Sequence, residues 1–119
     1  MSIQLKTSYK ETIIENIEKN KETYIDASHR IHENPEIGNE EYFASKLLTD
    51  ILKKAGFSIQ KGVGTHETAF VARKEGKKTG RKVAFLAEYD ALPGIGHACG
   101  HNIIGTTSVA AAIAVSQVI

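Results

Sequence analysis

Hydrophobic residues in the first third of the chain recur at the spacing of one helix face. They are Ile13, Ile14, Ile17, Tyr24, Ile25 and Ile31, with the small Ser28 on the same side. Ser8, followed three residues later by Glu11, forms a capping-box pattern that predicts a helix over residues 9–33. Because the ring of Pro35 disfavours helical geometry at Asn34, we expect the helix to end there.

A second helical pattern follows after a short connection. Its apolar positions are Phe43, Leu47, Leu48, Ile51 and Leu52. Asn39 is a suitable N-cap for this helix, and Gly56 allows the left-handed exit with which many helices end. The two helices are therefore expected to form a hairpin with one shared apolar side.

Beyond Gly56 the period changes from helical to alternating. Phe57, Ile59 and, further on, Val63 point one way, whereas Ser58 and Gln60 point the other, which predicts a strand. Residues 68–73 and 82–89 are also rich in β-forming residues. The charged segment 74–81 between them contains glycine, so we expect these two runs to form a hairpin.

Residues 83–87 are apolar at consecutive positions, which is typical of a central strand covered on both faces. A helix from about Ile103 onward would cover one of those faces. The predicted fold class is therefore α/β: a helical hairpin followed by a mixed β-sheet and a buried helix.

The last helical pattern has no stop signal. Residues 109–119 are apolar nearly all round, and no glycine, proline or basic last turn ends them. Such a helix needs neighbours, so we expect the chain to be the amino-terminal part of a longer fold. Residues 102–119 lack ionisable side chains, but they fall short of the ~20 apolar residues of a membrane span and contain several polar residues, so a buried helix is the better interpretation.

The charge balance narrows the choice of partners. Fifteen basic and fourteen acidic residues leave a net charge of +1, and the basic cluster at residues 77–82 is best explained as a solvated turn, so no nucleic-acid partner is expected. The amino terminus lacks the apolar core of a secretory signal, and the single cysteine cannot form an intramolecular disulfide. These features predict a cytoplasmic protein with no membrane partner.

Residues 87–102 contain most of the candidate chemistry. Cys99 and His101 are separated by one glycine, so a thiolate and an imidazole can turn toward a single ion, with sulfur favouring zinc. A catalytic zinc takes about three protein ligands, so further ligands must come from elsewhere. Asp90 ends the predicted central strand, where it can bind metal or orient a ligand imidazole, and Glu88 points to the same side.

Two other interpretations of this stretch stay open on spacing alone. In the structural one, Asp90 starts a turn, Cys99 is a small buried hydrophobe and His101 is a hydrogen-bonded loop residue. In the other, Cys99 is a nucleophile activated by His97 or His101, which is weaker because neighbouring residues rarely reach the required alignment. His29, His32 and His66 are expected to be surface or packing residues.

Two motifs together carry a family resemblance. The upstream one reads HRIHENPEIGNEE from His29 to Glu41, and the central one reads EYDALPGIGHACGHN from Glu88 to Asn102. In these motifs and their spacing the chain resembles the M20 metallopeptidase family in its amidohydrolase branch, and the motifs are most similar to those of the group of M20 domain-containing protein 2 and aminobenzoyl-glutamate hydrolases. The resemblance covers the chain from about Ser28 to its end.

The resemblance implies roles for individual residues. Cys99 and His101 match metal ligands, and Asp90 matches the catalytic acid at the end of the metal-site strand. Glu88, His97 and Asn102 are candidates to support the ligands through hydrogen bonds. Asn102 stands where many relatives have aspartate, and Glu88 stands where other branches carry a ligand histidine or a further aspartate. The motif around His32 and Glu36 is expected to be structural.

The resemblance also implies an activity and its limits. Family members hydrolyse amide bonds in dipeptides or N-acyl amino acids with water activated between two divalent metal ions, Zn²⁺ or Mn²⁺, Co²⁺ or Ni²⁺. Residues 1–119 would be an incomplete catalytic domain, without the later glutamate pair and without the inserted domain through which relatives form homodimers. We therefore expect little or no hydrolysis by this chain alone. The alternative is a non-catalytic fragment, or a metal-binding or oligomerising module.

Overall fold

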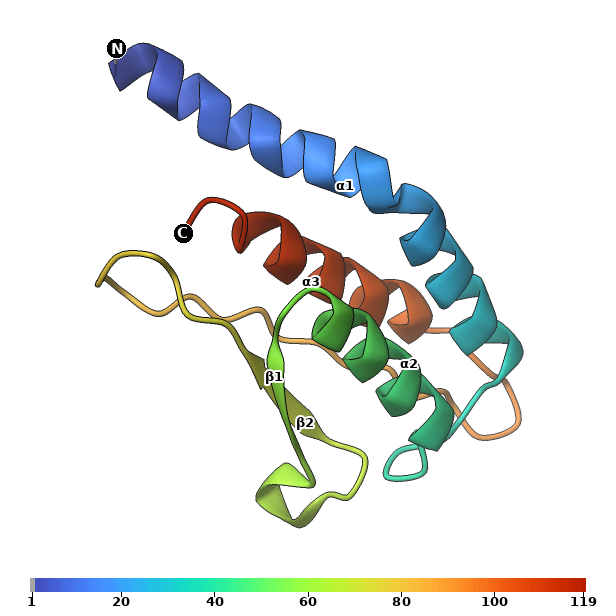
Figure 1. Cartoon of the computed structure of the whole chain (residues 1–119). Helices are drawn as coiled ribbons and strands as arrows, with labels where there is room; N and C mark the ends of the chain where they lie inside the picture. Colours follow the sequence, from blue (N-terminus) through green and yellow to red (C-terminus); the bar gives the residue numbers. More distant parts are fainter. Residues whose placement is uncertain (1) are drawn as a thin grey trace.

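The computed structural model describes residues 2–119, and the side chains of residues 8–119. The described residues form three α-helices, a two-stranded antiparallel hairpin and a short 3-10 turn, in the order α1 (Ser2–Glu33), α2 (Tyr42–Lys54), β1 (Ser58–Lys61), η1 (Val63–Thr65), β2 (Phe70–Arg73) and α3 (His101–Val115) (Figure 1). The architecture combines helices with a small sheet, consistent with the α/β class, but the sheet of the described chain has only two strands, which are antiparallel, instead of the predicted mixed sheet.

Helix α1 ends where the sequence predicts and begins earlier. It starts at Ser2, so Ser8 lies inside the helix and the predicted capping box is wrong. The residues before Ser8 include Gln, Leu and Lys, which are good helix formers and continue the helix toward the amino terminus. At the other end, the Asn34 side chain donates to the Arg30 carbonyl at 2.8 Å, ahead of the break imposed by Pro35.

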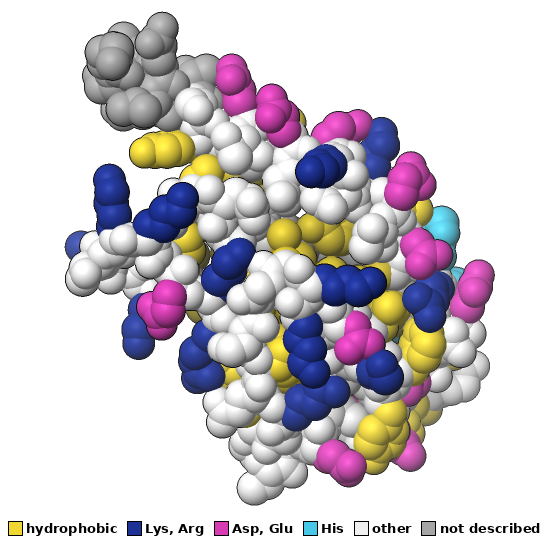
Figure 2. Space-filling view, viewed as in Figure 1, with side chains coloured by type: hydrophobic (Ala, Val, Ile, Leu, Met, Phe, Trp, Pro, Cys, Tyr) yellow, Lys and Arg dark blue, Asp and Glu magenta, His cyan; other side chains and the backbone are white. Residues whose placement is uncertain are grey.

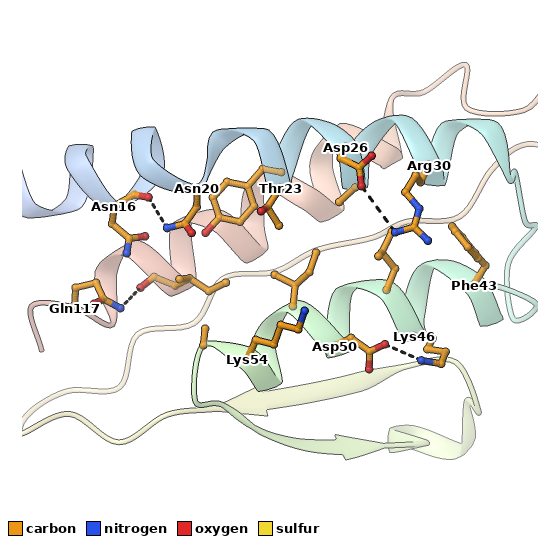
Figure 3. A pocket seen from close by; sticks show the side chains of 16 residues that line it. Asn16, Asn20, Thr23, Asp26, Arg30, Phe43, Lys46, Asp50, Lys54 and Gln117 are labelled. Carbon is orange, nitrogen blue, oxygen red and sulfur yellow. Dashed lines mark hydrogen bonds and ion pairs between the residues drawn. The ribbon is translucent and has the colours of Figure 1, made fainter.

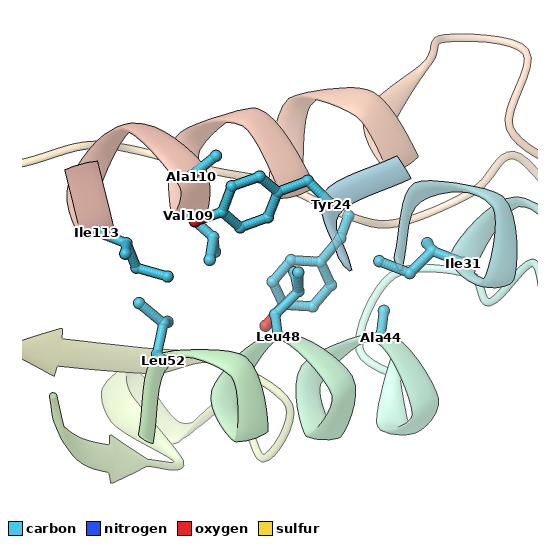
Figure 4. Packing of buried hydrophobic residues seen from close by; sticks show 9 residues of the cluster. Tyr24, Ile31, Ala44, Leu48, Leu52, Val109, Ala110 and Ile113 are labelled. Carbon is cyan, nitrogen blue, oxygen red and sulfur yellow. The ribbon is translucent and has the colours of Figure 1, made fainter. Parts of the chain in front are cut away.

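The core lies where the three helices meet, and it is dominated by large apolar side chains (Figure 4). Its members are Tyr24, Ile31, Ala44, Leu48, Leu52, Tyr89, Val109, Ala110 and Ile113. Helix α1 packs more extensively against α3 than against α2. The predicted α1–α2 hairpin is therefore completed by a third helix, which shares the apolar side of both.

The connection between α1 and α2 differs from the prediction. Asn39 has a left-handed φ of 69° and does not cap α2; its Oδ1 lies 2.7 Å from Nδ1 of His66. Glu41 occupies the N-cap position without a side-chain cap bond. Instead, a more distant side chain, that of Glu36, accepts hydrogen bonds from amides of the first turn. At the far end Gly56 has a φ of 91°, as predicted.

Strand β2 pairs with β1, not with residues 82–89. The register runs from Ser58 opposite Arg73 to Lys61 opposite Phe70. The predicted hairpin between residues 68–73 and 82–89 is wrong, because the short η1 connection returns β2 directly alongside β1. Val63 belongs to that turn instead of the strand.

Residues 82–89 form no strand within the described part of the chain, and none of their backbone groups pairs with another backbone group there. Val83 is 68 % exposed and Leu86 is 91 % exposed, so the prediction of a strand covered on both faces is wrong for this structure. Helix α3 contacts the segment, and the Ser108 hydroxyl donates to the Leu86 carbonyl at 2.7 Å.

Helix α3 begins at His101, two residues before the predicted start, and one of its sides is buried. Gly105 is needed on this side, because a Cβ there would lie 3.2 Å from both the Glu88 carbonyl oxygen and the Tyr89 Cβ. On another side Ile103 is 56 % exposed, so the helix is only half buried. Across residues 2–119, no helix combines the length and the apolar character that a membrane crossing requires.

Candidate metal centre

Three side chains that are candidates for metal chemistry converge at the start of α3. Glu88, Asp90 and His101 each offer one ligand atom, and these atoms lie within 4.8 Å of one another. Nδ1 of His101 is 2.8 Å from Oδ1 of Asp90, and Nε2 of His101 is 3.3 Å from Oε1 of Glu88. One imidazole and two carboxylates are a donor set that fits Zn²⁺, Mn²⁺, Co²⁺ or Ni²⁺.

The two sides of this cluster are held by different parts of the fold. Tyr89, between the two acids, is buried, and its hydroxyl donates to the Thr68 carbonyl at 2.5 Å. On the other side, Gly100 adopts a left-handed φ of 76° as the N-cap of α3, which places His101 in the first helical position. A residue with a side chain would be strained at that φ.

The charge state of His101 follows from its neighbours. The hydrogen bond to Asp90 raises the pKa of His101, and the negative charges of Glu88 and Asp90 add to this effect, while burial opposes it. Because a metal ligand must be a neutral imidazole, an ion would compete with the proton at this ring. Asp90 on Nδ1 fixes the ring orientation and leaves Nε2 directed at Glu88.

Cys99 lies outside this group. Its side chain is exposed and free of disulfides, which contradicts its interpretation as a buried hydrophobe. The nucleophile interpretation also finds no support: both ring nitrogens of His97 lack hydrogen-bond partners, and both ring nitrogens of His101 face carboxylates. No hydrogen bond joins Cys99 to either imidazole within the described side chains. The role of Cys99 as a metal ligand stays a prediction.

His97 and Asn102 are buried beside the cluster without joining it. His97 is 8 % exposed, and burial lowers its pKa, with the nearby His32 and His101 acting in the same direction. Its ring centroid lies 6.3 Å from that of His32, so the upstream motif packs against the central one. Asn102 donates to the Ser28 hydroxyl at 3.1 Å, which fastens α3 to α1.

One hollow of the described surface lies away from these three residues. A cavity of about 700 Å³ runs between α1, α2 and the end of α3, and none of the three clustered residues lines it (Figure 3). Asp26 and Arg30 on α1 pair across its rim, as do Lys46 and Asp50 on α2. On the face shown in Figure 2, acidic side chains follow α1, and basic side chains predominate over the middle and left of the view with a few acidic ones among them.

Comparison with known proteins connects this geometry to a class of enzymes. No protein-family model matches the chain. It is 36 % identical to one of the subunits of the p-aminobenzoyl-glutamate hydrolase of Escherichia coli (strain K12) over 119 residues, covering 85 % of this chain and 24 % of that protein. It is 39 % identical to the Xaa-Arg dipeptidase of Homo sapiens over 99 residues, covering 74 % of this chain and 23 % of the dipeptidase.

A third similarity, 41 % over 87 residues, is to thermostable carboxypeptidase 2 of Saccharolobus solfataricus (strain ATCC 35092 / DSM 1617 / JCM 11322 / P2), covering 61 % of this chain and 22 % of the carboxypeptidase. The similar proteins are thus hydrolases and peptidases. The chain belongs to the M20 amidohydrolase and peptidase family. It spans about a quarter of the length of the curated relatives it matches.

Proposed function

We propose that this chain supplies part of the divalent-metal site of an M20 amidohydrolase that cleaves amide bonds in dipeptides or N-acyl amino acids. The observation that carries the proposal is the convergence of Glu88, Asp90 and His101 in a family of hydrolases. The names of the relatives, an aminobenzoyl-glutamate hydrolase and a dipeptidase among them, support this substrate class.

Each residue of the cluster would have a different role in binding the ion. A bound divalent ion would polarise the amide carbonyl and lower the pKa of water. His101 would hold the ion, and Asp90 keeps the ring in one orientation through Nδ1, the common arrangement of a carboxylate behind a ligand histidine. Glu88 is near enough to Nε2 to share the ion. Cys99 is the predicted further ligand from the same loop.

Metal binding is the direct test of this proposal. We expect Co²⁺ titration, followed by calorimetry and by the visible spectrum, to detect binding to the 119-residue protein. His101→Ala should weaken binding about tenfold or more, because it removes the only nitrogen of the cluster. His66→Ala is the matched control, since His66 is an exposed histidine that pairs with Asn39 instead. Equal Co²⁺ affinity in the wild type and in His101→Ala would refute the site.

Activity tests the extent of the site in this chain. The cluster offers three ligand atoms from the described chain, fewer than a site for two ions needs, so we expect little or no hydrolysis of a dipeptide or an N-acyl amino acid by the isolated protein. Measurable turnover that disappears in Cys99→Ala would show that the chain already forms a working site with Cys99 in it.

A second candidate function is self-association as a non-catalytic module, which is favoured by the exposed apolar segment Val83 to Ala87. If two copies pair antiparallel about Phe85, Lys82 of each stands opposite Glu88 of the other, so the charges match. Light scattering after size exclusion at several concentrations separates the two functions. A monomer at all concentrations removes this candidate and leaves the metal site untouched.

A further inference from the structure

Glu36 belongs to the upstream motif and also bonds to the central motif, which lies far from it in the sequence. Its carboxylate accepts hydrogen bonds from the amide groups of Phe43 at 2.8 Å and Ala44 at 2.9 Å, in the first turn of α2. Its carbonyl oxygen accepts from the amide of Ala91 at 2.7 Å. Ala91 is the residue directly after Asp90, so one residue connects the start of α2 to the acid of the candidate metal centre.

The side-chain bonds of Glu36 make it a rigid support. The first amide groups of a helix have no partner within the helix, and the N-cap residue Glu41 supplies none through its side chain. The negative carboxylate meets these amides at the positive end of the helix dipole, where charge-assisted bonds are strongest. Both carboxylate oxygens are used, so Glu36 is held in position from its side-chain end.

The backbone carbonyl of Glu36 connects this fixed side chain to the loop of the metal centre. Ala91 is buried, and its amide has no other backbone partner in the described chain. Next to it, Pro35 packs against the turn that follows Asp90: a Cβ at Gly96 would lie 3.9 Å from the Pro35 Cβ. Asp90 in turn holds His101 at 2.8 Å. A path of direct contacts therefore runs from the first turn of α2 to the imidazole.

We infer that Glu36 is a positioning residue for the metal centre: by anchoring on α2 and holding Ala91, it sets the place of Asp90 relative to His101. The consequence for metal affinity rests on the proposed function. The structural step, the hold of Glu36 on Ala91, does not depend on it.

The first measurement is amide hydrogen exchange in the metal-free protein, using Glu36→Gln. Glutamine keeps the length of the side chain but turns one acceptor into a donor that faces an amide hydrogen. We expect the Ala91 amide to exchange at least about tenfold faster, beyond any factor shared by core amides such as those of Leu48 and Ala110. An Ala91 rate that rises only by the factor of the core amides would overturn the inference and leave Glu36 as a helix cap.

Two control variants separate a specific effect on the Ala91 amide from general destabilisation. Asp50→Asn makes the same chemical change on the exposed face of α2, where Asp50 pairs with Lys46, and should leave Ala91 exchange unchanged. Leu52→Ala removes a core side chain and should raise the exchange of Ala91 and of the core amides together. If Glu36→Gln does not fold, Glu36→Asp takes its place: it keeps the charge but is too short to hold both amides without shifting the backbone, and the same excess at Ala91 is expected.

The second measurement is Co²⁺ affinity. Glu36→Gln should weaken binding about tenfold, the usual size of a supporting-residue effect, whereas Leu52→Ala should not alter the affinity of the folded protein. Unchanged Co²⁺ affinity in Glu36→Gln would refute the functional part of the inference. If the wild-type protein binds no Co²⁺, the proposed function fails, and the Ala91 exchange rate still decides whether Glu36 positions the loop.

Discussion

Two adjoining segments, residues 81–88 and 89–102, differ in how far their side chains are buried. The first is the more apolar, yet every one of its residues is exposed. The second contains three glycines and the first none, yet Tyr89, Ala91, His97 and Asn102 within the second are buried. The difference lies in partners: the second segment bonds to Thr68, Glu36 and Ser28, whereas the first receives a side-chain bond from α3. Apolar character alone therefore does not bury a segment without elements placed to cover it.

The largest expected effect on stability comes from comparing Leu48, in the core against which the second segment packs, with Leu86 in the first segment. Leu48 is fully buried in the core that also contains Tyr89, so Leu48→Ala should lower the free energy of unfolding by about 3 kcal/mol through lost burial and a cavity. Leu86→Ala, at a position 91 % exposed, should change it by less than about 0.5 kcal/mol. Urea denaturation of dilute protein measures both. Similar losses in the two variants would mean that residues 81–88 are buried in solution.

A smaller effect is expected where the two segments meet α3. Gly105→Val would place side-chain atoms against the Glu88 carbonyl oxygen and the Tyr89 Cβ, and overpacking of this kind costs about 2 kcal/mol. Gly80→Val is the control, because no atom lies within 4 Å of a Cβ there. Thermal unfolding followed by circular dichroism compares the variants. A Gly105 variant as stable as the wild type would show that α3 does not pack closely on this part of the chain.

The anchor of Tyr89 gives a third, weaker contrast. Its buried hydroxyl bonds to the Thr68 carbonyl, so Tyr89→Phe leaves that acceptor without its partner and should cost about 1 kcal/mol of unfolding free energy. Tyr42→Phe removes an exposed hydroxyl that lies 3.3 Å from Glu67, and should cost less than about 0.5 kcal/mol. Equal costs would mean that the bond to Thr68 does not hold residues 89–102 in place.

The smallest effect concerns protonation in the buried segment. Asp90 raises the pKa of His101 above its ordinary value of 6.5, so their bond stabilises the folded state below about pH 6.5, and this stabilisation is lost as pH rises through the higher folded-state pKa. Asp90→Asn should lower the His101 pKa and flatten this pH dependence. NMR titration of His101 in metal-free protein, with His101→Ala to assign its signal, is the measurement. An unchanged His101 pKa would exclude the Asp90 bond as its cause.

Much of the local structure was predictable from short-range signals. Pro35 ended α1 and Gly56 ended α2 because a ring and a missing side chain act on the backbone at their own positions. The same-side placement of Glu88 and Asp90 and the pairing of Asp90 with an imidazole were also anticipated, since they need only alternation and a nearby histidine.

Glu36 shows what short-range reasoning missed. A signal was present: Glu41, directly before α2, is a poor N-cap, so the first amides of the helix needed an acceptor from elsewhere, and an acid after Pro35 was within reach. Asn39 was the better cap by residue type, but its left-handed backbone directs its side chain to His66.

The sequence by itself determined where α1 and α2 stop, which residues are candidates for metal ligands and which family the motifs resemble, because each depends on residue types and spacings within a few positions. Only the tertiary structure decided which segment is buried and that Glu36 contacts both α2 and the loop of the candidate metal centre. Those outcomes rest on contacts between distant residues, such as Tyr89 with Thr68 across 21 positions and Asn102 with Ser28 across 74, and such contacts form only when the packing of the helices brings both partners to one place.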